Sequence, residues 1–294
     1  MRPDVSQALL AILCVIWNFN SSVLAADLVV RHLPSQGEKD LRNNYYIALL
    51  SLALEKTQEQ YGAFRLDTID DRMLPRRALE GLTKNELVDV IWSMTSLKKE
   101  ALLRPIRIPL YKGLLGYRVL LIREQDQEKF RKIEHFNELK SLVAGQGRDW
   151  SDVSILQANG LSVATSAHYE GLFDMLRAGR FDYFPRGISE VWSEIRSKQT
   201  EGLVVEDSIL LKYTAPMYFF VNNSNSSLAE RIEKGLRLAI SDGAFDKAFH
   251  KETGNKILFD LPAIKSRKFF NLSNPTLPDK TPVNDLQLWY SLEK

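Results

Sequence analysis

The sequence predicts an α/β protein with parallel, doubly wound sheets. Two observations lead to this prediction. Short runs of β-branched residues alternate with longer segments that lack glycine and proline, and this alternation continues over most of the chain. The length of 294 residues is enough for one large domain or two smaller ones.

The first part of the chain is predicted to follow the order strand, helix, strand, helix, strand. The predicted elements are a strand at 27–33, a helix at 41–61 capped by Asp40, a strand at 64–69, a helix at 75–82 and a strand at 87–92. This order favours a parallel sheet, whose ligands gather at the carboxyl ends of the strands. His32, Trp92 and Thr95 are therefore candidate ligand contacts.

A change in polarity near Ile122 indicates a domain boundary. The apolar run 117–122 is followed by the charged, helical segment 123–140, and a second α/β unit follows, with strands at 161–164 and 181–184 and helices at 152–158, 169–178 and 187–198. Aromatic and β-branched residues return at 213–223, before a long helix that Ser227 can cap. We therefore expect a second unit at 123–212 that interrupts a first unit formed by 27–122 and 213–254.

The C-terminal segment 255–294 is predicted to be extended. Its prolines at positions 262, 275, 278 and 282 oppose a helix. Trp289 and Tyr290 are expected to dock this tail on the first unit.

Residues 1–26 are typical of an export signal. Arg2 precedes the apolar run 8–17, which is shorter than the roughly 20 residues of a membrane-spanning helix, and small residues follow at Ala25 and Ala26. The mature chain is expected to begin at Ala26 or Asp27 in the periplasm. The single cysteine, Cys14, lies in this segment, so the mature chain would have no thiol or disulfide.

Composition and motifs exclude several function classes. A net charge of +2 gives no dense basic field for nucleic acid. The four histidines lack zinc-motif spacing, and neither a nucleotide-binding glycine motif nor a Gly-x-Ser-x-Gly motif occurs. We therefore predict no metal, no cofactor and no catalytic residues.

Five local patterns, in this order and spacing, resemble the amino-acid-type extracellular solute-binding proteins of family 3. They are 85–89 with the following "WSMTS", "LKKEALLRPIRIPLY" at 97–111, "SLVAGQG" at 141–147, "LRAGRFDYF" at 176–184 and "SSLAERIEKGLRLAISDGAFDKAF" at 226–249. The resemblance covers nearly the whole mature chain. It implies a two-lobe periplasmic binding protein fold, with two doubly wound sheets joined by two crossing hinge strands around a ligand cleft.

The resemblance also implies where the ligand is held, and here this sequence departs from the family. The family's carboxylate-binding arginine corresponds to Lys98 or Lys99, only one of which can point fully inward. The glycine turn at Gly147 is followed by Arg148, and Arg186 stands near the position of the family's ammonium-binding aspartate. Converging cations favour an anionic ligand. The alternatives are that Arg186 pairs with Glu190, four residues on, and that the lysines are solvated.

Aromatic contacts complete the candidate site. Trp92 and Tyr111 could stack on the ligand, or they could simply seal the core. The predicted ligand-binding set comprises His32, Trp92, Thr95, Lys98, Lys99, Tyr111, Gly147, Arg148 and Arg186.

The resemblance implies a monomeric, periplasmic protein that captures a small polar solute by hinge closure. It would present the solute to a membrane transporter or a sensor. Two alternatives remain open. One is a cyclohexadienyl dehydratase-like enzyme on the same scaffold, with Glu170 or Glu190 as its acid. The other is an interaction protein without a ligand.

Overall fold

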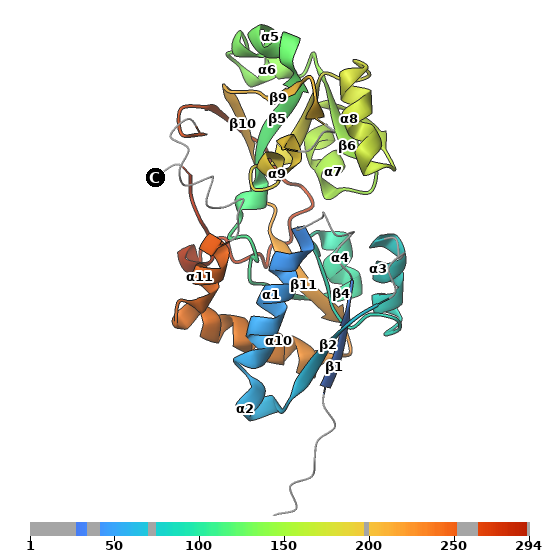
Figure 1. Ribbon diagram of the computed structural model, residues 1–294, viewed down its shortest axis with the longest axis vertical. Coiled ribbons are helices and arrows are strands. Elements are labelled where there is room, and N and C mark those ends of the chain that lie inside the picture. Colours follow the sequence, from blue (N-terminus) through green and yellow to red (C-terminus); the bar gives the residue numbers. More distant parts are fainter. Residues whose placement is uncertain (1–27, 34–41, 70–74, 197–199, 252–263, 293–294) are drawn as a thin grey trace, which may run out of the picture.

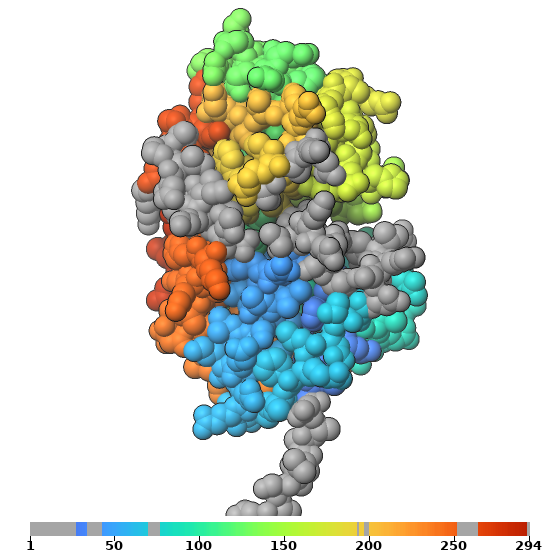
Figure 2. Space-filling model, viewed as in Figure 1, coloured from blue at the N-terminus to red at the C-terminus, as the bar shows by residue number. Residues whose placement is uncertain are grey.

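The computed structural model describes residues 28–33, 42–69, 75–196, 200–251 and 264–292, which form two lobes, one above the other (Figure 1). Figure 2 shows the same lobes in space-filling form, the second in green and yellow and the first mainly in blue, cyan and orange. The predicted export signal lies outside the described residues. Within them, no helix combines the length and the apolar character needed to cross a bilayer.

The first lobe contains two small sheets covered by helices. β1 (Leu28–His32) pairs in parallel with β2 (Phe64–Thr68), and an antiparallel sheet has the order β3 (Ile91–Met94), β11 (Met217–Asn222), β4 (Leu103–Ile106). The helices are α1 (Arg42–Glu55), α2 (Gln58–Tyr61), α3 (Pro75–Thr83), α4 (Leu97–Leu102), α10 (Ser226–Ser241) and α11 (Ala244–Lys251). In the first lobe, the predicted parallel pairing is therefore seen between β1 and β2, whereas β11 returns from the second lobe and pairs antiparallel with both β3 and β4.

Two details of the first lobe differ from the sequence prediction. The helix predicted over 41–61 is divided at Thr57, whose hydroxyl donates to the carbonyls of Ala53 and Leu54, both at 3.0 Å. Helix α10 is capped by Asn225 rather than Ser227, since the Asn225 side chain accepts the Leu228 N–H at 3.2 Å. Both differences arise from side-chain to backbone hydrogen bonds that compete with the regular helix.

The second lobe is built on one sheet. Its strand order is β12 (Lys268–Asn271), β10 (Ile209–Lys212), β5 (Tyr117–Arg123), β8 (Tyr183–Gly187), β6 (Val143–Gly147), β7 (Ser162–Ser166), and β9 (Leu203–Val205) also pairs with β5. The helices of this lobe are α5 (Gln127–Arg131), α6 (Phe136–Leu139), α7 (Ser151–Ala158), α8 (Tyr169–Arg177) and α9 (Val191–Ile195). The segment 123–140 is thus not one helix. The Glu138 carboxylate accepts the N–H groups of Glu134 and His135 and caps α6, which separates it from α5.

Two crossing segments, 107–116 and 213–216, join the lobes and touch each other. Tyr213 donates its N–H to the Gly116 carbonyl at 3.0 Å. A Cβ atom on Gly116 would lie 2.0 Å from the Tyr213 carbonyl oxygen, so glycine is required for this approach. One apolar cluster runs from Val30 in the first lobe through Leu110 and Leu114 of the crossing to Phe173 in the second. The lobes therefore share a continuous core at the hinge.

The sequence predicts that the C-terminal tail packs on the first lobe. In the structure, the tail packs on both lobes. Its strand β12 pairs in parallel with β10 and becomes an edge of the second lobe's sheet. The tail then returns to the first crossing segment, where the Trp289 ring occupies the space beside Gly113. Pairing to β10 satisfies the backbone of a segment that contains no proline between 263 and 274.

Candidate ligand site between the lobes

Lys99 links the two lobes. It lies on α4 in the first lobe, and its Nζ donates to the Met94 carbonyl at 2.8 Å and to the Ser151 hydroxyl of the second lobe at 3.2 Å. Burial lowers the pKa of Lys99 to about 8, although the nearby Asp152 carboxylate acts in the opposite direction. A partly desolvated ammonium group between two lobes is a site where an anionic group of a ligand would be stabilised.

The backbone before Lys99 decides which of the two adjacent lysines points inward. The Ser96 hydroxyl accepts the Lys99 N–H at 3.3 Å and caps α4. The buried Thr95 hydroxyl donates to Glu100 at 2.7 Å. Lys98 is exposed, so Thr95 supports α4 and Lys99 alone reaches the second lobe.

The first lobe contains a group of connected aromatic rings. Trp92 on β3 stacks on Tyr46 with a ring separation of 5.5 Å, and Tyr111 lies 5.4 Å from Tyr46. The His32 ring is 6.2 Å from Trp92, with its Nδ1 atom 2.7 Å from the Leu33 carbonyl oxygen. The structure therefore groups His32, Trp92 and Tyr111, and it adds Tyr46, which the sequence does not single out.

The second lobe carries a buried network of charges. Arg118 on β5 contacts Asp152 at 2.8 Å and Glu190 at 3.6 Å, and the Tyr213 hydroxyl donates to Asp152. Burial acts to lower the pKa of Arg118, but Asp152 keeps it above its usual value, and burial raises the pKa of Tyr213. Asp152 follows Ser151 directly, so this network begins at the residue that Lys99 contacts.

Arg186 belongs to the same network, and its guanidinium is already paired with carboxylates of the protein. Its Nε and Nη2 atoms donate to Glu194 at 2.9 Å and 2.5 Å, and Nη2 lies 3.4 Å from Glu190. Its side chain is only 2% exposed. The sequence alternative of a pair with Glu190 is thus realised in part, but the closer partner is Glu194 on α9.

Gly147 and Arg148 do not form the expected anion-binding turn. Gly147 is the last residue of strand β6, and a Cβ atom there would lie 2.5 Å from the Trp150 ring. Arg148 is exposed, and its N–H donates to the Ser166 carbonyl at 2.8 Å. Glycine is needed at position 147 because the Trp150 ring packs against it. Of the four predicted cations, Lys99 is the one that, among the described residues, makes a hydrogen bond to the other lobe.

No protein-family model matches the sequence, and no curated protein matches it. Solved structures do match. An ancestral arginine-binding protein bound to arginine shares 18% identity, covers 76% of this chain and 98% of its own, and has a TM-score of 0.57.

Two other solved structures give the same result. An amino acid ABC transporter substrate-binding protein from Streptococcus pneumoniae, bound to L-arginine, shares 14% identity over 77% of this chain and 93% of its own, with a TM-score of 0.57. A histidine kinase sensor domain with similarity to periplasmic binding proteins shares 16% identity over 78% and 96%, with a TM-score of 0.55.

This chain has the two-lobe fold of periplasmic binding proteins. The resemblance seen in the sequence is confirmed at the level of the fold, as is the α/β two-lobe architecture. Sequence identities below one fifth do not transfer a ligand, which must be argued from the residues of this chain.

Several residues of this binding-protein fold escape sequence reasoning. They are Tyr46, Arg118, Trp150, Asp152, Tyr169, Glu194 and Tyr213. Arg118 leaves one signal, because it is the only charge inside the apolar strand "YRVLLI". Glu194 leaves none, since it lies eight residues from Arg186 and is brought near by the turn into α9.

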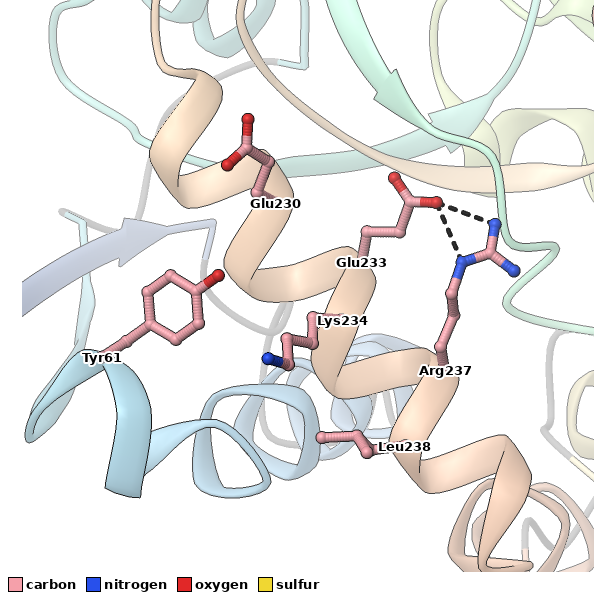
Figure 3. A pocket seen from close by; sticks show the side chains of 6 residues that line it. All are labelled: Tyr61, Glu230, Glu233, Lys234, Arg237 and Leu238. Carbon is pink, nitrogen blue, oxygen red and sulfur yellow. Dashed lines mark hydrogen bonds and ion pairs between the residues drawn. The ribbon is translucent and has the colours of Figure 1, made fainter.

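A hollow on the outer side of the first lobe is a different kind of feature. It encloses about 470 Å³ beside α2 and α10 and is lined by Tyr61, Glu230, Glu233, Lys234, Arg237 and Leu238 (Figure 3). Glu233 accepts from Arg237 at 2.8 Å within one helix face, as surface pairs commonly do. Its lining is open and charged, in contrast to the buried ion pairs of Arg118 and Arg186 in the second lobe.

Proposed function

We propose that this protein is a periplasmic solute-binding protein that captures a small, zwitterionic, amino-acid-like solute between its lobes. The observation that carries the proposal is the Lys99 side chain, which extends from the first lobe to Ser151 of the second. A ligand carboxylate that reaches Lys99 would contact both lobes at once and would favour their closed arrangement.

The balance of charges argues for a zwitterion over a multiply acidic ligand. The cations Lys99, Arg118 and Arg186 lie beside the carboxylates of Asp152, Glu190 and Glu194. Within the part of the chain that the structure describes, these three positive and three negative groups cancel, so a ligand with several acidic groups would meet uncompensated repulsion. A solute with one carboxylate and one ammonium group keeps the balance.

The aromatic face of the first lobe suits the remainder of such a solute. Trp92 is half-buried, and it stacks on Tyr46 next to Tyr111. Binding sites for small polar solutes commonly combine such rings with a few placed polar groups. The solved structures of similar fold are described as binding arginine or glutamine, or as a putative cystine transporter, which agrees with a solute of this class.

Delivery to a membrane transporter or to a sensor follows from the same proposal. Structures of similar fold include both an ABC transporter substrate-binding protein and a histidine kinase sensor domain. The export signal proposed for residues 1–26 agrees with a periplasmic location, and we propose a monomer that uses hinge closure as its output. An enzymatic role gains no support, because Glu190 is engaged by Arg118 and Arg186, and Glu170 is exposed.

The experiment that tests the proposal is a thermal-shift screen of the mature protein against amino acids and mono- and dicarboxylic acids. We expect Tm to rise with a zwitterionic amino acid, and calorimetry then gives its affinity. Lys99→Met should weaken binding about tenfold or more, because it leaves the ligand carboxylate without its cation. The matched variant Lys98→Met, one residue away and exposed, should bind as the wild type does.

Two results would contradict this function. One is a panel in which no solute changes Tm. The other is an equal loss of affinity in the Lys98 and Lys99 variants, which would assign the effect to the general charge of α4.

Export is tested separately. Mass spectrometry of protein released from the periplasm should show a mature N-terminus at Ala26 or Asp27, because small residues precede the cleavage point. Released protein that still begins at Met1 would contradict a cleaved signal.

A further inference from the structure

The surroundings of Arg186 have the chemistry of a binding site for a guanidinium ion. Three rings lie near its guanidinium carbon, with centroids at 4.8 Å for Phe184, 5.0 Å for Trp150 and 5.5 Å for Tyr169. Glu194 accepts from its Nε and Nη2 atoms, and Glu190 lies 3.4 Å from Nη2. Aromatic faces combined with carboxylates are how proteins recognise a free guanidinium group.

The walls of this cage are held independently of Arg186. Trp150 precedes α7, where its ring packs against Gly147 and stacks on Phe184 at 6.1 Å. Tyr169 begins α8, and its hydroxyl donates to Glu194 at 2.5 Å. Helix α9 carries Glu194, so three elements besides β8 build the cage.

A second buried arginine, Arg231, also lies near rings but has different hydrogen-bond partners. Arg231 is 2% exposed and also has rings near it, Tyr61 at 5.8 Å and Phe64 at 5.6 Å. Its hydrogen bonds go to backbone carbonyls, including Gly62 at 2.7 Å, and to the Thr57 hydroxyl. Arg231 therefore ties α10 to the segment 54–62, whereas Arg186 is bound by side chains as a ligand would be.

The cage is connected to the contact between Lys99 and Ser151 through one bridging carboxylate. Glu190 lies between Arg186 and Arg118, and Arg118 contacts Asp152 next to the Ser151 hydroxyl that Lys99 reaches. The cage is thus linked by ion pairs to the part of the second lobe that Lys99 contacts.

We propose that Arg186 fills a guanidinium subsite of the second lobe from within the chain, and thereby excludes solutes with a guanidinium group. This inference rests on the proposed function, since it assigns specificity to the same site. Removal of the Arg186 side chain opens the subsite to an external cation, which restores the charge balance around Glu190 and Glu194.

The test uses the mature Arg186→Ala variant with methylguanidinium as the probe. We expect a probe concentration of ten times Kd to raise the Tm of this variant by about 3–5 °C and to leave the wild type unchanged. L-arginine should bind the variant at least about tenfold more tightly than it binds the wild type. Tetramethylammonium, which has the same charge but no N–H donors for the carboxylates, should raise the Tm of the variant less than methylguanidinium does at the same concentration.

The matched control is Arg231→Ala, which opens an arginine-sized space that has no carboxylate partner among the described residues. An equal response of this control, or of the wild type, would overturn the proposal, as would an Arg186→Ala variant that responds to neither probe. If Arg186→Ala does not fold alone, refolding from urea is measured with and without methylguanidinium. Recovery of native protein only with methylguanidinium supports the proposal, and no recovery overturns it.

These outcomes are distinct from those of the proposed function. The solute screen uses the wild type and depends on Lys99, whereas methylguanidinium reports on the cage itself and requires no knowledge of the natural solute. If the wild type binds no amino acid, the proposed function fails. The response of Arg186→Ala to methylguanidinium still tests whether the cage binds a guanidinium ion.

Discussion

Two groups of residues, the first face in the first lobe and the second face in the second lobe, are built from different chemistry. The first-lobe face consists mainly of neutral rings, with Trp92 stacked on Tyr46 beside Tyr111. The second-lobe face contains a buried network in which Arg118 and Arg186 are surrounded by carboxylates. Dispersion and ring packing stabilise the first face and tolerate loss of one contact, whereas the second depends on every charge keeping its partner.

The largest expected effect comes from breaking the second face. Arg186→Ala should lower the free energy of unfolding by about 3–5 kcal/mol, because it leaves Glu194 buried without its cation. The measurement is urea denaturation at constant ionic strength. Arg237→Ala, which breaks the exposed pair with Glu233 in Figure 3, should cost only about 0.5 kcal/mol.

A double variant that removes both Arg186 and Glu194 tests whether the ion pair explains the instability of Arg186→Ala. The double variant Arg186→Met with Glu194→Met should recover much of the stability lost in Arg186→Ala, since no charge is then left buried alone. A double variant as unstable as the single one would show that the ring cage, rather than the ion pair, requires the arginine.

A smaller effect is expected at Lys99, where the first lobe contacts Ser151 of the second. The pKa of Lys99 is about 8 in the folded protein and 10.5 in the unfolded chain, so the unfolded state binds the proton more tightly. The stability contribution of Lys99 therefore rises with pH from about 8 to 10.5, by about 1 kcal/mol between pH 7 and pH 9. The difference in unfolding free energy between the wild type and Lys99→Met gives this change directly. A difference that is constant with pH would contradict the lowered pKa.

The smallest effect is expected on the first face. The Tyr45 hydroxyl donates to the buried Leu110 carbonyl at 2.7 Å, and its ring lies 4.6 Å from Tyr111. Tyr45→Phe keeps the ring and removes the donor, so it should cost about 0.5–1 kcal/mol in thermal or urea unfolding. A cost comparable to that of Arg186→Ala would contradict the contrast between the two faces.

The sequence predicts the fold better than it predicts the site, and the reason lies in the range of the interactions. Alternating apolar runs are local, so they reveal β1, β5 and α8 closely. The partner of Arg186 is decided by how α9 turns back over β8, which no spacing rule contains. Glu190, four residues away, is the local choice, and it proves the more distant of the two carboxylates.

The aromatic residues illustrate the same limit. Trp92 follows from its place at the end of a predicted strand, but its stacking partner Tyr46 comes from α1, whose buried face gives no sign of which side chain reaches β3. The glycines of "GQG" suggest a turn in the sequence, yet in the structure they make room for the Phe181 and Trp150 rings. Close approach and turn formation both require glycine, and composition alone does not separate them.

The C-terminal tail sets a mechanical limit on any opening of the lobes. Strand β12 ends at Asn271 beside β10 in the second lobe, and the Thr276 carbonyl accepts the Leu97 N–H of the first lobe at 2.8 Å. The five residues 272–276 have a contour length of about 17 Å when fully extended. As long as the Thr276 bond persists, the end of β12 cannot move farther than this tether from α4, so the angular travel of the hinge is bounded by chain length as well as by contacts.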